Sequence, residues 1–158
     1  MKNRKQASIL IVEDHELMRM ALRDSLQQAF PGYRIDTAAN GEESIAFLRR
    51  HRPEVVLMDV RLPGMNGIEA ARGIKKRAPA TAVIMCTGSD DQGERAAAEL
   101  AGATAWIPKD HVRNMLVPTI RGSVCALSLS AQGRMAQRAC AAWIPARRSD
   151  NEVHALQR

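Results

Sequence analysis

The stretch that decides the fold runs Glu54-Val55-Val56-Leu57-Met58-Asp59-Val60-Arg61-Leu62-Pro63-Gly64-Met65-Asn66-Gly67. Its four consecutive apolar residues, Val55 to Met58, are typical of a strand that is buried on both faces. Proline, asparagine and two glycines follow, and these residues favour a turn. Asp59 is therefore expected at the carboxyl end of a central strand. In open α/β sheets that edge is where ligands bind.

Strands and helices alternate along the whole chain around this stretch. Apolar runs predict five strands at residues 8–12, 33–37, 55–58, 81–86 and 103–107. Helical spacing of apolar residues predicts helices at 15–30, 40–50, 67–77, 90–100 and 112 to about 127. Such alternation predicts an α/β fold with a doubly wound parallel sheet of five strands and helices on both faces. An eight-unit barrel would need about 250 residues, which excludes it.

The composition fits one packed domain with an aliphatic core. The chain has 158 residues, of which 46% are apolar and only 3% aromatic. Its apolar runs are far shorter than the roughly 20 residues that cross a bilayer, and no segment resembles a signal peptide. Cys86, Cys125 and Cys140 are odd in number and widely spaced, which indicates free thiols in a reducing compartment. We therefore expect a cytoplasmic protein without a membrane segment.

The charge is concentrated at the carboxyl end of the chain. Of the net charge of +6, residues 1–110 carry +1 and residues 111–158 carry +5. We expect a frayed start at 1–7, a folded domain at 8–127 and a basic extension at 128–158 that is partly helical or disordered. A basic tail can meet nucleic acid, an acidic partner or only solvent.

Polar residues stand at the carboxyl ends of four of the predicted strands. They are Glu13 and Asp14 after the first strand, Asp59, Thr87 and Lys109. Crowded carboxylates need a cation to stay ionised, and oxygen ligands of this kind suit Mg²⁺. A carboxylate can also attack phosphorus and form an acyl phosphate, while a metal ion and a lysine neutralise the developing charge.

In order and spacing these residues resemble the receiver domain of two-component response regulators, the CheY-like fold. The matching pieces are Ile9-Leu10-Ile11-Val12-Glu13-Asp14, Val56-Leu57-Met58-Asp59-Val60-Arg61-Leu62-Pro63-Gly64-Met65-Asn66-Gly67, Thr87-Gly88 and Gly102-Ala103-Thr104-Ala105-Trp106-Ile107-Pro108-Lys109. The resemblance covers about residues 8 to 127. It is specific because four separate motifs agree in order, spacing and strand position. It implies the strand order 2-1-3-4-5.

The resemblance implies a chemical role for several residues. Asp59 would accept a phosphoryl group from the phosphohistidine of a sensor histidine kinase or a phosphotransfer protein. Glu13 and Asp14 would hold Mg²⁺ together with Asp59 and the backbone carbonyl of Arg61. Lys109 would pair with the phosphoryl group. Such a domain is a phospho-acceptor switch rather than an enzyme, because it catalyses only its own phosphorylation and dephosphorylation.

The resemblance also implies a conformational switch. Thr87 would turn inward to bond a phosphoryl oxygen, and Trp106 would swing inward with it. The output face would be the fourth helix, fifth strand and fifth helix, through which two copies could pair. Trp106 departs from the usual Tyr or Phe, so the larger indole could crowd the switch or simply pack in the core. Both interpretations are open.

Two residues close in sequence to the predicted site, Asp110 and Arg61, add to the resemblance. Asp110 follows Lys109, and this pair is frequent in the NarL/FixJ branch, whose members usually carry a LuxR-type helix-turn-helix. The side chain of Arg61 could control the access of water to the phosphoryl group, or it could be solvated.

The tail supports no single interpretation. A LuxR-type domain needs about 60 residues with a recognition helix, and only 36 residues follow Gly122. We therefore expect no helix-turn-helix output domain. The tail could be an interaction segment, a linker to an absent output domain, or a non-specific nucleic-acid contact through arginine. The main alternative function is accordingly a DNA-binding transcription regulator. A docking module that needs no phosphorylation is disfavoured, because it need not keep charges that repel.

Overall fold

The structure is a computed structural model that describes residues 6–89 and 91–131. Its strands are β1 (Ser8–Val12), β2 (Arg34–Ala38), β3 (Val55–Asp59), β4 (Ala82–Thr87) and β5 (Ala105–Pro108). Its helices are α1 (Glu16–Ala29), α2 (Gly41–Phe47), α3 (Gly67–Arg77), α4 (Gln92–Leu100) and α5 (Val112–Ala131), with a short 3-10 helix, η1 (Lys109–His111), before α5. The predicted alternation of strands and helices is therefore confirmed over the described residues.

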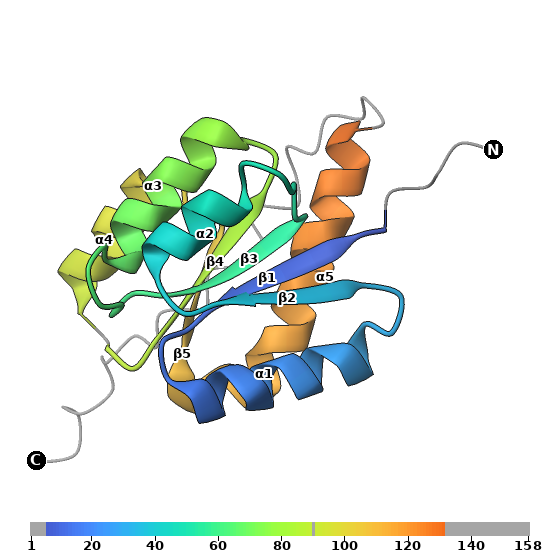
Figure 1. Cartoon of the computed structure of the whole chain (residues 1–158), viewed down its shortest axis with the longest axis horizontal. Coiled ribbons are helices and arrows are strands. Elements are labelled where there is room, and N and C mark those ends of the chain that lie inside the picture. Colours follow the sequence, from blue (N-terminus) through green and yellow to red (C-terminus); the bar gives the residue numbers. More distant parts are fainter. Residues whose placement is uncertain (1–5, 90, 132–158) are drawn as a thin grey trace, which may run out of the picture.

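All five strands form one parallel sheet in the order β2-β1-β3-β4-β5. Helices α2, α3 and α4 cover one face of the sheet, and α1 and α5 cover the other (Figure 1). This is the doubly wound CheY-like arrangement that the sequence predicted. The order of the strands reverses between β1 and β3, and the carboxyl ends of those two strands border the crevice where such sheets bind ligands.

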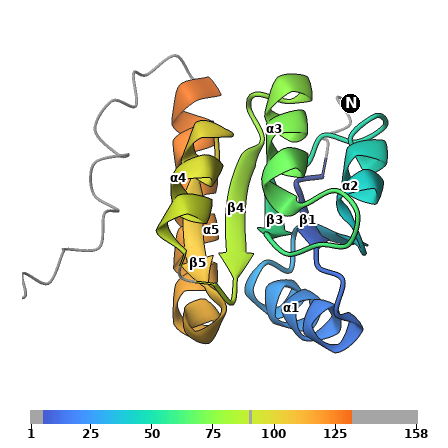
Figure 2. The same ribbon diagram turned by 90° about the vertical axis from the view of Figure 1, so that its left-hand side faces the viewer.

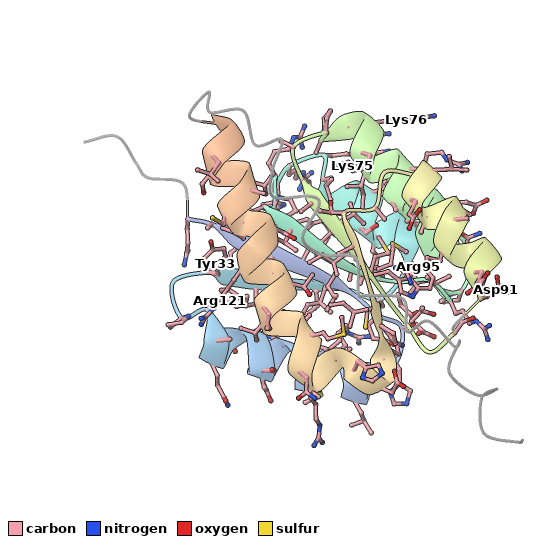
Figure 3. All side chains as sticks on the ribbon, turned by 180° about the vertical axis from the view of Figure 1, so that it is seen from behind. Tyr33, Lys75, Lys76, Asp91, Arg95 and Arg121 are labelled. Atoms are coloured by element: carbon pink, nitrogen blue, oxygen red, sulfur yellow. The ribbon has the colours of Figure 1, made fainter. Side chains whose placement is uncertain are left out.

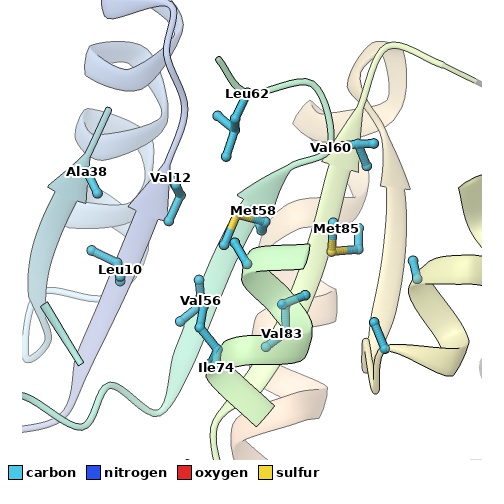
Figure 4. Packing of buried hydrophobic residues seen from close by; sticks show 14 of the residues in the cluster. Leu10, Val12, Ala38, Val56, Met58, Val60, Leu62, Ile74, Val83 and Met85 are labelled. Atoms are coloured by element: carbon cyan, nitrogen blue, oxygen red, sulfur yellow. The ribbon is translucent and has the colours of Figure 1, made fainter. Parts of the chain in front are cut away.

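The central strands are buried on both faces, which explains their continuous apolar runs. Because alternate side chains point to opposite faces, each strand serves two cores. Leu10 and Val12 of β1 belong to the cluster under α2, α3 and α4, which Figure 4 shows at close range. Ile9 and Ile11 belong to the cluster under α1 and α5. Each fully buried aliphatic side chain stabilises the fold by about 1.5–3 kcal/mol.

Four helices begin with a side chain that caps the first turn. The caps are His15, Asn40, Asn66 and Asp91, and they accept hydrogen bonds from the amides of Met18, Glu43, Glu69 and Glu94. Each of these helices follows a strand directly, so its first turn lies beside the carboxyl edge of the sheet. In Figure 2, β4 appears as an arrow pointing toward this edge. The caps therefore fix the loops that surround the edge.

Several predicted boundaries were wrong by a few residues. Helix α2 ends at Phe47 rather than at residue 50, because residues 48–50 form a turn that is held by the guanidinium of Arg52 on the carbonyl of Leu48. Helix α4 begins at Gln92, since Asp91 acts as its cap. Helix α5 continues past residue 127 to Ala131.

Some sequence predictions concern residues outside the described part. These are residues 1–5 of the predicted frayed start, Cys140, and residues 132–158 of the predicted basic extension. Among the described residues, Cys86 is a buried free thiol and Cys125 an exposed one. None of the helices within 6–89 and 91–131 combines the length and the apolar character needed to cross a membrane.

Candidate functional site

Three carboxylates meet at the carboxyl edge of the sheet. One oxygen from each of Glu13, Asp14 and Asp59 lies within 4.8 Å of the others. Glu13 and Asp14 follow β1 and Asp59 ends β3, and these strands are neighbours in the sheet. Glu13 and Asp59 are buried, whereas Asp14 is exposed. The structure thus brings together the three acidic side chains that the sequence singled out.

Lys109 joins two of these carboxylates. Its Nζ lies 2.7 Å from Asp59 Oδ2 and 2.8 Å from Glu13 Oε2. Partial burial acts to lower the pKa of Lys109, but hydrogen bonds and Coulombic attraction from Asp59 and Glu13 outweigh that effect, so its pKa is raised. One ammonium therefore faces two carboxylates, with a third beside them. The excess of negative charge favours binding of a cation at this place.

The backbone fixes the orientation of the acidic groups. The amide of Arg61 donates to Asp59 Oδ1 at 3.2 Å, and the amide of His15 donates to Glu13 Oε1 at 3.3 Å. Both Asp59 oxygens therefore have a donor, one from the backbone and one from Lys109. The acceptor carboxylate is thus held in one orientation before any ligand arrives.

The turn after β3 folds back tightly on Asp59. The amide of Gly67 donates to the carbonyl of Val60 at 2.9 Å. A Cβ atom at residue 67 would overlap the carbonyl oxygen of Asp59 and lie 2.8 Å from its carbonyl carbon. Gly64 in the same turn has a φ of +74°, which favours glycine. The glycines that the sequence marked as turn formers are therefore required by the close approach of the backbone.

Sequence reasoning missed Arg19, which supports the acidic pair. Its Nη1 atom donates to the carbonyl oxygens of Glu13 at 2.7 Å and Asp14 at 3.1 Å. These bonds hold the β1–α1 loop against the first turns of α1. The signal in the sequence was an arginine one turn into the helix that follows the acidic pair. His15, by contrast, was expected to begin that helix, and it does so as the cap.

The two predicted switch residues have no recorded hydrogen bond to the carboxylates. Thr87 ends β4 and is fully buried, and its Oγ1 accepts a hydrogen bond from the amide of Ser89 at 3.2 Å. The structure records no hydrogen bond from Thr87 to Asp59 or Lys109. Trp106 is buried in the core cluster that includes Met85 and Ala98. In this structure Trp106 is therefore a packing aromatic under α4.

A pocket of about 520 Å³ opens beside the carboxylates. Its lining includes Asp14, Arg61, Asn66 and Glu94. Arg61 Nε lies 3.9 Å from Glu94 Oε1, so this ion pair links the loop after β3 to the first turn of α4. One interpretation of the sequence was that the side chain of Arg61 is solvated. It is 71% exposed, but it also pairs with Glu94. Glu94 is a second residue that sequence reasoning missed.

The donor set fits a hard divalent cation. Carboxylate oxygens are the ligands that Mg²⁺ prefers, and Mg²⁺ usually binds through one or two carboxylates together with water or phosphate oxygens. An open pocket next to the carboxylates leaves room for such further ligands. The cluster of Glu13, Asp14 and Asp59 therefore has the chemistry of a magnesium site.

Cys86 lies beside the site but does not have the chemistry of a nucleophile. It pairs with Asp59 across β3 and β4 and is buried. Burial raises the pKa of its thiol to about 12, and the carboxylates of Asp59 and Glu13 add to this rise while Lys109 opposes it. The thiol therefore stays protonated at neutral pH and is unreactive.

Comparison with known proteins agrees with this geometry. The profile of the response regulator receiver domain matches residues 9–121. Among curated proteins, the response regulator MprA of Mycobacterium sp. (strain KMS) is 32% identical over 113 residues, which are 72% of this chain and 48% of that protein. The chain thus spans about half the length of the curated relatives it matches.

Two solved structures are similar in fold and sequence. A two-component response regulator of the LuxR family from Aurantimonas sp. SI85-9A1 has a TM-score of 0.71 and 30% identity, with 76% of this chain and 86% of that one covered. The receiver domain of a sensor histidine kinase from Pseudomonas aeruginosa PAO1 has a TM-score of 0.68 and 27% identity, with 75% and 98% covered. The latter has a magnesium ion coordinated in its active-site cleft.

Receiver domains bind Mg²⁺ at an acidic pocket, and the corresponding cluster is present here. The family match covers well over half of the chain, and the fold, the sheet order and the carboxylates all agree with it. The chain therefore belongs to the response regulator receiver family, whose domain is a phospho-accepting switch of two-component signalling and not a conventional enzyme.

Proposed function

We propose that Asp59 receives the phosphoryl group, from a phosphohistidine on a sensor histidine kinase or a phosphotransfer protein. The observation that carries the proposal is the buried Asp59 carboxylate, held by Lys109 Nζ at 2.7 Å and the Arg61 amide at 3.2 Å beside two further carboxylates. An Asp59 oxygen attacks phosphorus, and the bond from phosphorus to the histidine nitrogen breaks. The electron pair of that bond stays with the imidazole.

The roles of the surrounding groups follow from their charge. Glu13, Asp14, Asp59 and the backbone carbonyl of Arg61 would hold Mg²⁺, which when bound neutralises charge on the acceptor and on the phosphoryl oxygens. Lys109 pairs with the phosphoryl group, and its raised pKa keeps it charged at neutral pH. The ammonium already bridges Glu13 and Asp59, so it need move only a short way to meet a third anionic group.

The response to phosphorylation would run through Thr87 and Trp106. Thr87 stands at the end of the strand next to β3, where its O–H could donate to a phosphoryl oxygen; its oxygen now accepts from the amide of Ser89. Trp106 on β5 pairs with Met85 on β4, two residues before Thr87, so a change at the end of β4 can reach it. The output face would then be α4, β5 and α5, through which two copies could form a homodimer.

The wider assignment rests on the sequence. The Lys109-Asp110 pair favours the NarL/FixJ branch, and a cytoplasmic location is consistent with reaction with a kinase phosphohistidine. The receiver would comprise residues 8–127, with 128–158 as a basic extension.

The net charge of +5 over residues 111–158 favours one alternative, a DNA-binding regulator that uses its tail.

The primary test is labelling with acetyl phosphate in the presence of Mg²⁺. Wild type should acquire one phosphoryl group, and Asp59→Asn should acquire none. Asp24→Asn, an exposed change on α1, is the control and should be labelled like wild type. Equal labelling of wild type and Asp59→Asn would show that Asp59 is not the acceptor.

The DNA-binding alternative has a separate test. If the tail binds duplex DNA, the full chain should bind with a strong salt dependence and deletion of residues 129–158 should abolish binding. Absence of duplex binding by the full chain at low salt would remove this alternative.

A further inference from the structure

An ion pair lies in the lining of the pocket beside the acidic cluster. Arg61 stands two residues beyond Asp59 in the loop after β3, and Glu94 lies in the first turn of α4. The 3.9 Å separation of Arg61 Nε and Glu94 Oε1 joins these two elements, and both residues line the pocket together with Asp14. The pair therefore lies next to the acidic cluster, on the side where the pocket opens.

The position of Glu94 is fixed by a series of hydrogen bonds from the end of β4. The amide of Ser89 donates to Thr87 Oγ1, and the amide of Asp91 donates to Ser89 Oγ, both at 3.2 Å. Asp91 Oδ1 then accepts from the amide of Glu94 at 2.9 Å. Figure 3 shows Asp91 at the start of α4. The backbone of Glu94 is thus anchored near the carboxyl edge.

The two partners differ in freedom and in bonding. The side chain of Glu94 is 29% exposed and that of Arg61 is 71% exposed. Glu94 Oε2 is buried and has no hydrogen-bond partner in the structure, although a buried carboxylate oxygen without a donor is costly. Within residues 6–89 and 91–131, Arg61 is the ion-pair partner recorded for Glu94. Glu94 is therefore the more buried partner, and its carboxylate attracts the exposed guanidinium.

We propose that Glu94 is a positioning residue that holds the Arg61 guanidinium against α4 and away from the phosphoryl site. The inference rests on the proposed role of Asp59. While Arg61 is paired with Glu94, the side-chain cation bonded to Asp59 is Lys109. The positive charge of Arg61 is then balanced by the Glu94 carboxylate. A small anionic donor then meets the Asp14 carboxylate in the pocket lining without an unpaired arginine beside it. Glu94 would thereby slow phosphorylation by small anionic donors.

The chemistry of labelling defines the expected effect. With acetyl phosphate, an Asp59 oxygen bonds to phosphorus while the bond from phosphorus to the acetyl oxygen breaks, and acetate leaves with the electron pair. A guanidinium released from Glu94 would attract the donor dianion and the beryllofluoride anion that mimics the phosphoryl group. Glu94→Gln should therefore raise both the labelling rate and the beryllofluoride affinity by about two- to fivefold, the range expected for an exposed ion pair.

The test uses the full chain with Mg²⁺ as wild type, Glu94→Gln, Arg61→Gln and the double variant. Labelling is followed with acetyl phosphate, and beryllofluoride affinity is measured by calorimetric titration. If Glu94 acts through Arg61, the single variant Glu94→Gln is labelled faster than wild type. The double variant is then labelled at the same rate as Arg61→Gln. Glu94→Asp keeps the charge and should restore values close to wild type.

A matched control lies on the same helix. Glu99 pairs with Arg95 at 3.8 Å along α4, outside the pocket lining, so Glu99→Gln should leave labelling and beryllofluoride binding unchanged. The inference is overturned if Glu94→Gln equals wild type, if its effect persists without Arg61, or if Glu99→Gln has the same effect. Labelling that persists in Asp59→Asn would instead overturn the role of Asp59.

Discussion

Gly67 matters to the acceptor as much as the charged residues do. After Asp59 the chain folds back so closely that residue 67 has no room for a Cβ atom. The same glycine opens α3, with Asn66 as its cap. The turn, the helix start and the orientation of the acceptor therefore depend on one missing side chain.

Gly67→Ala should lower the free energy of unfolding by about 2–4 kcal/mol, since the new methyl group must displace the backbone of Asp59. Urea unfolding measures this change. Gly122→Ala is the control: a Cβ there meets nothing within 4 Å, and the residue lies inside α5. The free energy of unfolding of this control should rise by about 0.5–1 kcal/mol, because alanine favours a helix more than glycine does. A Gly67→Ala variant as stable as wild type would contradict the close packing.

Asp14 is the exposed member of the acidic cluster, and it has no ion pair with Lys109. Asp14→Asn should therefore weaken Mg²⁺ binding while leaving the Lys109 bridge intact. Added Mg²⁺ should raise the melting temperature of wild type, because a ligand that binds only the folded state stabilises it. The rise should be strongly reduced in Asp14→Asn and unchanged in Asp24→Asn. An equal rise in all three proteins would place the metal elsewhere.

At the scale of elements, the helix caps set where each loop leaves the carboxyl edge. Helix α2 is the shortest α-helix among the described residues and has a reciprocal cap. Asn40 Oδ1 accepts from the amide of Glu43 at 2.8 Å, and Glu43 Oε2 accepts from the amide of Ala39 at 2.8 Å. A helix of one or two turns has little stability of its own, so these bonds decide whether it forms.

Asn40→Ala should therefore cost about 1 kcal/mol of stability. Chemical denaturation measures it, with Asn114→Ala as the control, because Asn114 is an exposed residue inside α5 where alanine favours the helix. If Asn40→Ala proves no less stable than wild type, the cap does not hold α2.

The sequence predicted the strands and helices well because both of its apolar patterns are strong: continuous apolar runs mark the buried strands, and helical spacing of apolar residues marks the helices. Runs such as Ile9 to Val12 are apolar throughout since both faces of the sheet are covered. Element ends were less accurate, because a cap or a turn decides them and not the periodicity. Helical spacing also fails to separate Leu22, which is buried, from Leu17, which is 72% exposed on the same helix.

The candidate site was predictable where strand ends determine it. Parallel strands deliver their terminal residues to one edge, so Glu13, Asp14, Asp59 and Lys109 could be assembled from sequence position alone. Arg19 and Glu94 could not. Their contacts depend on how a helix side chain reaches a loop in the folded chain, and on distances that no spacing in the sequence records.

At the scale of the whole molecule, two faces carry exposed large apolar side chains. Leu100 is 87% exposed on α4, which is part of the proposed output face. Leu17 is 72% exposed on α1, which is not part of that face. If two copies pair through α4, β5 and α5, Leu100 lies at or near the contact and Leu17 lies away from it.

Beryllofluoride should therefore increase the fraction of dimer in sedimentation experiments. Leu100→Asp should reduce that increase, because a charge would be buried against the partner. Leu17→Asp is the matched control and should dimerise like wild type. Absence of any beryllofluoride-dependent change would favour a monomer that signals to a different protein.

The central claim is that Asp59 forms the acyl phosphate, and reduction by borohydride tests it most directly. Borohydride converts phosphoaspartate into homoserine, which peptide mass spectrometry then locates. After treatment with acetyl phosphate and Mg²⁺, we predict homoserine at position 59 and unmodified Asp14. Homoserine at position 14, or reduction at Glu13 with Asp59 intact, would contradict the assignment.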